Sequence, residues 1–269
     1  MNKNDLFTQI TDKIVATIEQ QGVLPWRQSF RAGPPVNYFS KRYYTGINYI
    51  FLSTDAVPTP YYLTFLQLNE LKLKLKKGAK GRKIIFWKLL TDSKDPDLSK
   101  QIPFLKYSNV FNLSDTENYE IPTPELSKPS NMLDKMKLIH NINFVNCIDG
   151  NCAYNMATDT IKTPTIEFFD SENEYFSSVF HELIHWTAHP ERANRKISTM
   201  FGNEEYAFEE LVAEIGASFL CSICGIENTL NNSISYINGW VKSAKMNPSY
   251  LIKASVQAQK AVKFLTEIN

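Results

Sequence analysis

The sequence lacks the features of a membrane-bound or secreted protein. No apolar run approaches the roughly 20 residues that a membrane-spanning helix requires. The amino-terminal segment MNKNDLFTQITDK has no apolar stretch like that of a secretory signal. We therefore expect a soluble protein of the cytoplasm with no membrane partner. Internal repeats are also absent, and 269 residues are enough for two modest domains.

Cysteine is scarce, with four residues in the chain. Cys221 and Cys224 fall in an apolar helical pattern, and Cys147 and Cys152 are spaced too widely for a zinc knuckle. A reducing compartment disfavours disulfides. We therefore expect four free thiols, used as small apolar side chains rather than as metal ligands.

Excess charge is also missing from the chain as a whole, which has a net charge of +1. The two parts of the chain nevertheless differ in net charge. Residues 1–113 hold 17 Lys and Arg against 8 Asp and Glu, a net charge of +9, whereas residues 114–269 hold 12 against 20, a net charge of −8. The opposite charges indicate two parts that face different partners.

Only four histidines are present, yet three of them fall within YFSSVFHELIHWTAH, residues 175–189. His181 and His185 are four residues apart, so on a helix both imidazoles reach the same point. Glu182 projects about 100° around that helix, where its carboxylate reaches a water bound to a metal rather than the metal itself. The pattern predicts a Zn²⁺ site with Glu182 as general base, because zinc lowers the pKa of its bound water to about 7.

A catalytic zinc needs a third protein ligand and keeps its fourth position for water. In the apolar helical pattern YAFEELVAEIGASFLC, Glu210 and Glu214 share a face. We expect Glu210 to bind the metal and Glu214 to hold the other ring nitrogen of a ligand histidine, the thermolysin-like (gluzincin) arrangement. His189 competes as third ligand, but it lies about 6 Å farther along the helix axis than His185. Such a site accepts Mn²⁺ as well as Zn²⁺.

The basic part of the chain interleaves cations with aromatic rings. A first amphipathic helix is expected to run to residue 21 and to end at Gly22, and residues 24–49 are expected to be mostly loop. Beyond them the pattern predicts a helix over residues 61–75 and strands over 84–87 and 104–113.

Seven cations and no acid lie within residues 72–83, a concentration of charge that attracts polyanions. Single-stranded nucleic acid is bound by such mixtures, because cations follow the phosphates while rings stack on bases, each stack contributing roughly 1–3 kcal/mol. The alternatives are core positions for the rings and a solvated turn for the cations. The candidate contacts are Trp26, Arg27, Arg42, Tyr43, Tyr44, Tyr49, Lys76, Lys77, Lys80, Arg82 and Lys83.

A proline-containing acidic segment separates the two parts, and we place a linker at residues 116–131. It would join a basic DNA-binding domain over residues 1–115 to a metallopeptidase domain over residues 132–269. The second domain is expected to contain a helix at 132–140, a strand pair within 144–159, an edge strand at 161–168 that pairs with a peptide over the metal, the two metal-site helices, and closing helices at 233–245 and 248–267.

With these motifs, the chain resembles the ArdC-type antirestriction proteins of conjugative plasmids and other mobile elements. The similarity covers nearly the whole chain and includes DLFTQITDKIVATIEQ, YTGINYIFL, KKGAKGRKIIFW, FHELIHWTAHPERANR and FGNEEYAFEELVAEIGASFLC. The resemblance implies an amino-terminal domain that binds single-stranded DNA and a zincin-like metallopeptidase domain, with His181, Glu182, His185 and Glu210 at the matching positions. This chain departs from the family at residues 70–73, where ELKL stands in place of the usual paired glycines.

We therefore expect a two-domain α+β protein, with a basic α+β domain joined by the linker to a mainly helical domain that has a small sheet. The expected function is antirestriction by binding single-stranded DNA, combined with zinc-dependent hydrolysis of a protein linked to restriction. Two alternatives stay open: a pure DNA-binding protein with a structural or vestigial metal, and a metalloprotease that acts on a regulatory protein. Tyr154, Tyr206 and His189 are the candidates for stabilising an oxyanion.

Overall fold

The computed structural model describes residues 3–22, 24–27, 33–55, 57–91, 101–117, 119–120, 122–148, 151–196, 203–229 and 234–267. In chain order its elements are α1 (Lys3–Gln21), η1 (Pro25–Arg27), β1 (Val36–Asn37), α2 (Ile47–Leu52), β2 (Tyr61–Thr64), α3 (Phe65–Glu70), β3 (Arg82–Thr91), β4 (Gln101–Asn112), η2 (Leu113–Asp115), α4 (Pro129–His140), β5 (Phe144–Cys147), β6 (Ala153–Asn155), β7 (Thr160–Pro164), η3 (Ile166–Phe168), α5 (Glu172–Trp186), α6 (Glu204–Cys224), α7 (Ile234–Met246) and α8 (Ser249–Thr266). Helices combined with two small sheets confirm the predicted α+β class.

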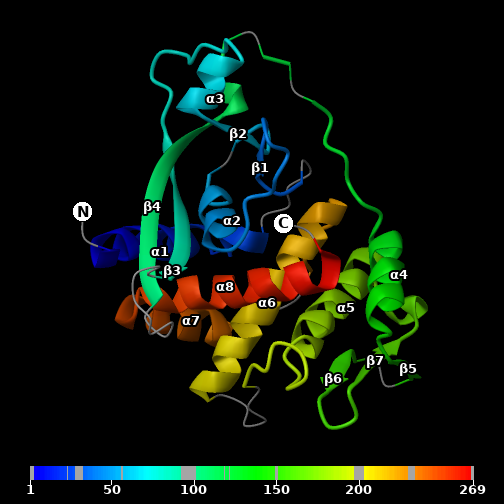
Figure 1. The fold of residues 1–269 in the computed structure, drawn as a ribbon. Coiled ribbons are helices and arrows are strands. Elements are labelled where there is room, and N and C mark those ends of the chain that lie inside the picture. The colour runs from blue at the N-terminus through cyan, green and yellow to red at the C-terminus, as the bar shows by residue number, and fades with distance from the viewer. Residues whose placement is uncertain are drawn as a thin grey trace.

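The first sheet has the strand order β1-β2-β4-β3, with β1 and β2 parallel and the other pairs antiparallel. Strands β3 and β4 form the long ribbon at the left of Figure 1. The predicted strands in this region are confirmed, but the predicted helix over residues 61–75 is correct only over residues 65–70, because α3 ends at Glu70 and residues 71–75 are not helical. Residues 61–64 pair as β2 and bury Tyr61, Tyr62 and Leu63. Thr64 then caps the short helix α3 through a capping box with Gln67.

The second sheet has the order β5-β7-β6. Residues 144–147 and 153–155 were expected to pair with each other, but both strands pair with β7 instead. Strand β7 was expected at an edge of the sheet and is its central strand, so that prediction is wrong. Strand β6 is the edge strand that contacts helix α5.

One hydrophobic core joins the two parts of the chain. Ile14 of α1 and Ile50 of α2 belong to the same buried cluster as Leu183 of α5, Ile215 of α6 and Ala258 of α8. In Figure 1, α8 crosses beside α6, α7 and α5 at the centre of the molecule. The predicted division into domains stays a prediction, and this shared core shows that the two parts pack directly against each other.

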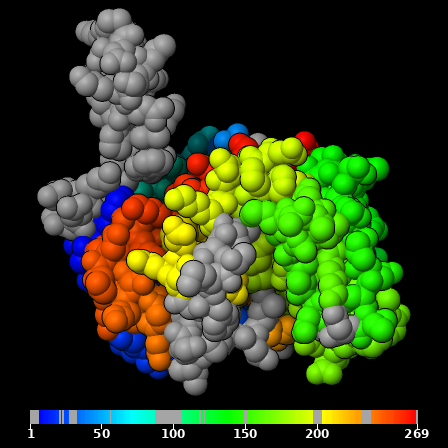
Figure 2. All heavy atoms as spheres, turned by 90° about the horizontal axis from the view of Figure 1, so that it is seen from below, coloured from blue at the N-terminus to red at the C-terminus, as the bar shows by residue number. Residues whose placement is uncertain are grey.

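The segment between the two sheets runs in an extended conformation from the region of η2 to α4, as the green trace in Figure 1 shows. It is tied to the helical part by a bond from the Ser127 N–H to the Ile223 carbonyl at 3.1 Å. Seen from below in Figure 2, orange α7 and the yellow start of α6 lie on one side, and the green atoms of α4 and the second sheet lie on the other. No helix in the described ranges is long and apolar enough to span a membrane. All four cysteines are free, as predicted.

Candidate metal centre

Helices α5 and α6 carry the predicted metal ligands and pack closely side by side. Helix α5 is capped by Ser171, whose Oγ accepts the Glu174 N–H, and α6 is capped by Asn203, whose side chain accepts the Tyr206 N–H. Gly216 of α6 faces Ile184 of α5, and a Cβ atom at this glycine would lie 2.7 Å from Ile184 Cδ1. A glycine is therefore what allows the two helices to approach.

The geometry brings His181, His185 and Glu210 together at one point. The two histidine Nε2 atoms lie 3.1 Å apart, and the Glu210 carboxylate lies 3.5 Å from each of them. All three candidate ligand atoms fall within 4.8 Å of one another. Tetrahedral ligands about 2.0–2.2 Å from one ion stand roughly 3.3–3.5 Å apart, so the spacing and the N/O donor set fit a divalent metal.

Charge at this point also favours a cation. Burial disfavours the charged imidazole of His185, but its contacts with Glu209 and Glu210 outweigh that effect and raise its pKa to about 10. Burial would raise the pKa of Glu210, yet the neighbouring His181 and His185 rings hold it well below its usual value. The raised pKa of His185 reflects the negative charge that Glu209 and Glu210 place around this point.

Glu209, which the sequence analysis did not select, holds the far side of His185. His185 Nδ1 donates to Glu209 Oε1 at 3.2 Å, which leaves Nε2 for the metal. Glu209 is 2% exposed and is itself held by Arg195, which donates to both carboxylate oxygens at 2.8 and 2.9 Å. Arg195 also donates to Thr187 Oγ1 and to the Ile184 carbonyl, so it fastens the end of α5 to α6. The sequence does contain one sign of this role: Glu209 is a second acid directly before Glu210 in a mostly apolar helical pattern.

The prediction that Glu214 supports a ligand histidine is wrong. Glu214 lies one turn beyond Glu210 on α6 and is fully buried. Its Oε1 accepts from Arg27 Nε at 2.5 Å. The additional turn moves this carboxylate about 6 Å along the helix axis, away from the histidines and toward η1. Arg27, predicted to contact DNA, is therefore one half of a buried ion pair.

Glu182, the predicted general base, lies beside the ligands and outside their cluster. Its Oε2 accepts the Tyr154 backbone N–H at 2.7 Å, so strand β6 fixes the carboxylate. The Tyr154 hydroxyl donates to Asp159 and accepts from Arg192. His189 lies outside the metal cluster, and its Nδ1 accepts the Glu191 N–H.

Three of the predicted stacking rings are buried in the structure. Trp26 and Tyr49 are each 1% exposed, and the Tyr49 hydroxyl bonds to the Trp26 carbonyl. Tyr44 is 9% exposed and accepts from the Asn37 amide. These rings cannot stack on bases at the surface, so that prediction is wrong for them. Tyr43 is half-buried, with its ring edge against Phe219.

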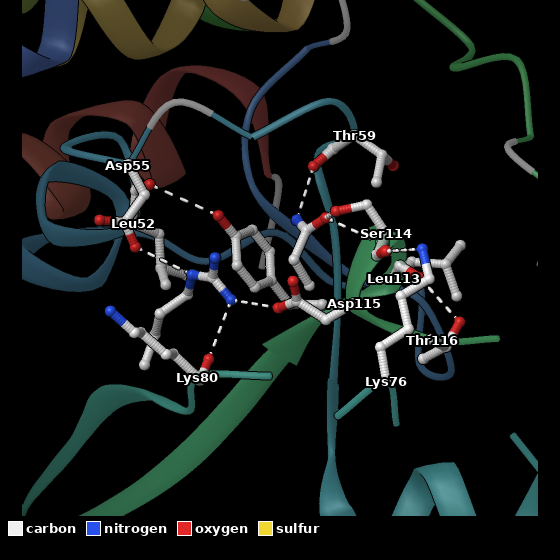
Figure 3. Close-up of polar contacts among 12 residues, drawn as sticks. Leu52, Asp55, Thr59, Lys76, Lys80, Leu113, Ser114, Asp115 and Thr116 are labelled. Carbon is white, nitrogen blue, oxygen red and sulfur yellow. Dashed lines mark hydrogen bonds and ion pairs between the residues drawn. The ribbon is translucent and has the colours of Figure 1, made fainter. Parts of the chain in front are cut away.

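The predicted cations fall into two groups. Arg42, Lys76, Lys77 and Lys80 are exposed, and Lys83 is half-buried. Arg82 is instead held by two carboxylates: its Nε donates to Asp55 at 2.9 Å and its Nη1 donates to Asp115 at 2.5 Å. Figure 3 shows Asp55, Asp115 and Lys80 around this network.

Comparisons with known families divide the chain in the same place as its charge. Residues 4–111 match the family described as the N-terminal domain of anti-restriction factor ArdC. Residues 135–257 match the family described as zincin-like metallopeptidase. The second match includes both histidines of the metal centre and Glu210.

Solved structures and curated relatives were also found. The metal-free crystal structure of antirestriction protein ArdC from plasmid R388 is 30% identical, with a TM-score of 0.80 over 98% of this chain and 97% of that chain. Its Mn(II)-bound structure is 29% identical, with a TM-score of 0.81 over 97% of each chain. A DNA primase TraC of Escherichia coli is 25% identical over 98% of this chain, which spans only 27% of the primase. Protein y4eC of Sinorhizobium fredii (strain NBRC 101917 / NGR234) is 23% identical over 97% of this chain and 91% of that protein.

Proposed function

Since the chain belongs to the ArdC family of antirestriction proteins, we propose that it binds single-stranded DNA and hydrolyses peptide bonds at a metal centre. A divalent metal is supported by the zincin-like match and by the Mn(II)-bound structure of the R388 protein. The observation that carries the proposal is the convergence of His181, His185 and Glu210 from two helices within 4.8 Å. Zn²⁺ and Mn²⁺ both suit two imidazoles and a carboxylate.

When bound, the ion supplies a Lewis acid and lowers the pKa of water. The side chains around it have separate tasks. Glu182, oriented by the Tyr154 amide, takes a proton from the attacking water and returns it to the leaving amine. Glu209 keeps a proton on Nδ1 of His185, so that Nε2 faces the metal. Arg195 prevents Glu209 from turning away.

DNA binding is supported by charge and by the family of the amino-terminal part. Residues 1–113 carry a net charge of +9, from 17 cations and 8 acids. Arg42, Lys76, Lys77 and Lys80 are exposed, and phosphate contacts of this kind bind without regard to base sequence. A protein that coats an incoming single strand needs this tolerance. The protein substrate would be a component linked to restriction.

The test is transfer of an unmodified plasmid into recipient cells that have a restriction system. We expect Glu182→Gln to abolish the protection given by the wild type, and Glu191→Gln, an exposed acid outside the site, to retain it. Metal content of the purified protein should fall in His181→Ala. If Glu182→Gln protected fully while charge reversal at Lys76, Lys77 and Lys80 abolished protection, DNA binding alone would account for the function and the peptidase proposal would fail.

A further inference from the structure

A groove of about 520 Å³ lies between helices α1 and α2 on one side and the start of β3 on the other. Four of its nine lining residues are cations, namely Lys13, Lys80, Arg82 and Lys83, and Asp55 is the single acid among them. The ring of Phe51 forms an apolar wall, with Lys13 Nζ 4.5 Å from its centre. This volume is in the range that accommodates nucleotide-sized ligands.

The charges in the groove are not equivalent. Asp55 is shared, because one of its oxygens accepts from Lys13 at 2.8 Å and the other accepts from Arg82 at 2.9 Å. Arg82 is paired with Asp115 as well, and its side chain is only 15% exposed. Two acids therefore offset the charges of Lys13 and Arg82. An arginine held in this way has little capacity left for a phosphate.

Arg82 instead shapes the groove. Its Nη1 donates to the Lys80 carbonyl at 3.0 Å as well as to Asp115, so it fixes the turn that carries Lys80. Figure 3 shows Asp55, Lys80 and Asp115 held together by these bonds. Gly81 follows in that turn, and a Cβ atom there would lie 3.2 Å from Asn109 of β4, so a larger residue would push the turn off the ribbon.

Lys80 and Lys83 remain as the uncompensated charges. Neither forms an ion pair with an acid in the part of the chain that the structure describes, and Lys80 is exposed. Two free ammonium groups beside a neutralised arginine leave a local excess of positive charge inside a concave site. Concave walls of low polarity strengthen such a field.

We propose that this groove binds the phosphodiester backbone of a single-stranded nucleic acid, with Lys80 and Lys83 contacting phosphates. Arg82 is a positioning residue, and Asp55 holds Lys13 and Arg82 while weakening the attraction for anions. The inference rests on the proposed DNA-binding function and assigns it a location. The groove, and not the buried rings of Trp26, Tyr44 and Tyr49, is then the surface that contacts the strand.

The experiment measures binding of a fluorescent single-stranded oligonucleotide to the full chain by anisotropy over a series of salt concentrations. Each phosphate contact contributes about 0.7 to the slope of log K against log salt for single strands. Lys80→Ala combined with Lys83→Ala should reduce the slope by about 1.4 and weaken binding. The matched control is Lys72→Ala with Lys74→Ala, two exposed lysines of the same basic segment that do not line the groove.

A second variant separates the proposal from loss of fold. Asp55→Asn removes the acid from the groove and should tighten binding several-fold, a gain that misfolding cannot produce. Asp115→Asn removes the other partner of Arg82 outside the groove and should have the smaller effect. If the wild type binds the strand but the Lys80/Lys83 double variant keeps its affinity and slope, the groove assignment is overturned and DNA binding stands. If the wild type does not bind the strand, both the groove assignment and the proposed DNA binding are overturned. If an equal concentration of nucleoside triphosphate displaces the strand, the groove does not recognise the phosphodiester backbone.

Discussion

Glu209 of α6 faces His185 of α5, with its Oε1 3.2 Å from the histidine Nδ1. The carboxylate is nearly fully buried and is clamped by Arg195. Burial would raise the pKa of Glu209, but the adjacent His185 and Arg195 lower it, so the group is a permanent anion behind the ligand. The candidate metal centre therefore comprises four residues: the three candidate ligands His181, His185 and Glu210, and Glu209 behind them.

Replacing this anion should weaken metal binding without removing a ligand. We expect Glu209→Gln to reduce the affinity for Zn²⁺ or Mn²⁺ about 10- to 100-fold, as is usual when the partner of a ligand histidine is lost. Glu210→Gln should cost more, because it removes a ligand. Competition with a chelator of known affinity measures both variants. Equal affinity of Glu209→Gln and the wild type would show that Glu209 has no part in the centre.

The buried Arg27–Glu214 pair should contribute to stability and not to metal binding. Glu214→Gln leaves the arginine charge buried without a full partner, which costs about 3–5 kcal/mol in the free energy of unfolding. Urea denaturation of the chelator-treated protein measures this loss. Replacing both residues with apolar ones of similar size should recover most of it.

The metal affinity of Glu214→Gln is a second test of the role assigned to Glu214. Metal affinity of folded Glu214→Gln should equal that of the wild type. A loss as large as that of Glu209→Gln would restore Glu214 as the support of a ligand histidine.

The approach of α5 to α6 depends on Gly216. In Gly216→Ala the new Cβ meets Ile184 at 2.7 Å, so the helices must move apart, at a cost of about 1–3 kcal/mol and with weaker metal binding. Gly239→Ala is the control, since Gly239 lies in helix α7 and its Cβ would meet nothing within 4 Å. That change should stabilise the protein by about 0.5–1 kcal/mol. Thermal unfolding measures the stability of both variants, and competition with a chelator measures their metal affinity. Equal stability and equal metal affinity in the two variants would contradict this role of Gly216.

Cys152, which is half-buried with its Sγ against Thr163 Oγ1, should react slowly with alkylating reagents. Burial raises the pKa of its thiol to about 11, from an ordinary value near 9. Two units leave about 100-fold less thiolate at pH 8, and the thiolate is the reactive form. The alkylation rate should therefore rise about tenfold per pH unit from pH 8 to 10, because the pH stays below the pKa. Mass spectrometry of labelled peptides follows Cys147 and Cys152 separately, and a flat pH profile for Cys152 would contradict the prediction.

Helical periodicity was sufficient to find the candidate ligands on each helix. His181 and His185 are neighbours on any α-helix because they are one turn apart, and the structure brings them together as predicted. Sequence patterns also predicted helices at α1, α4, α7 and α8 and strands at β3 and β4. All of these are local properties, in which near neighbours along the chain decide the conformation.

Contacts between distant segments were outside the reach of such patterns. Glu209 and Glu214 both lie on α6, and only the rotation of that helix against α5 decides which carboxylate meets His185 and which meets Arg27. The order β5-β7-β6 likewise depends on how the sheet packs against α5. A residue pattern within one element carries no information on the angle at which a second element docks.

By itself, the sequence determined the HExxH helix, the acid proposed as the third ligand, and the opposite charges of the two parts, because these follow from composition and from spacing along a single helix. Only the tertiary structure decided which carboxylate supports His185, that Trp26 and Tyr49 are core residues, and that Arg82 is neutralised by Asp55 and Asp115. The physical reason is that burial and pairing depend on side chains tens to hundreds of residues apart, which meet only after the helices and sheets have packed.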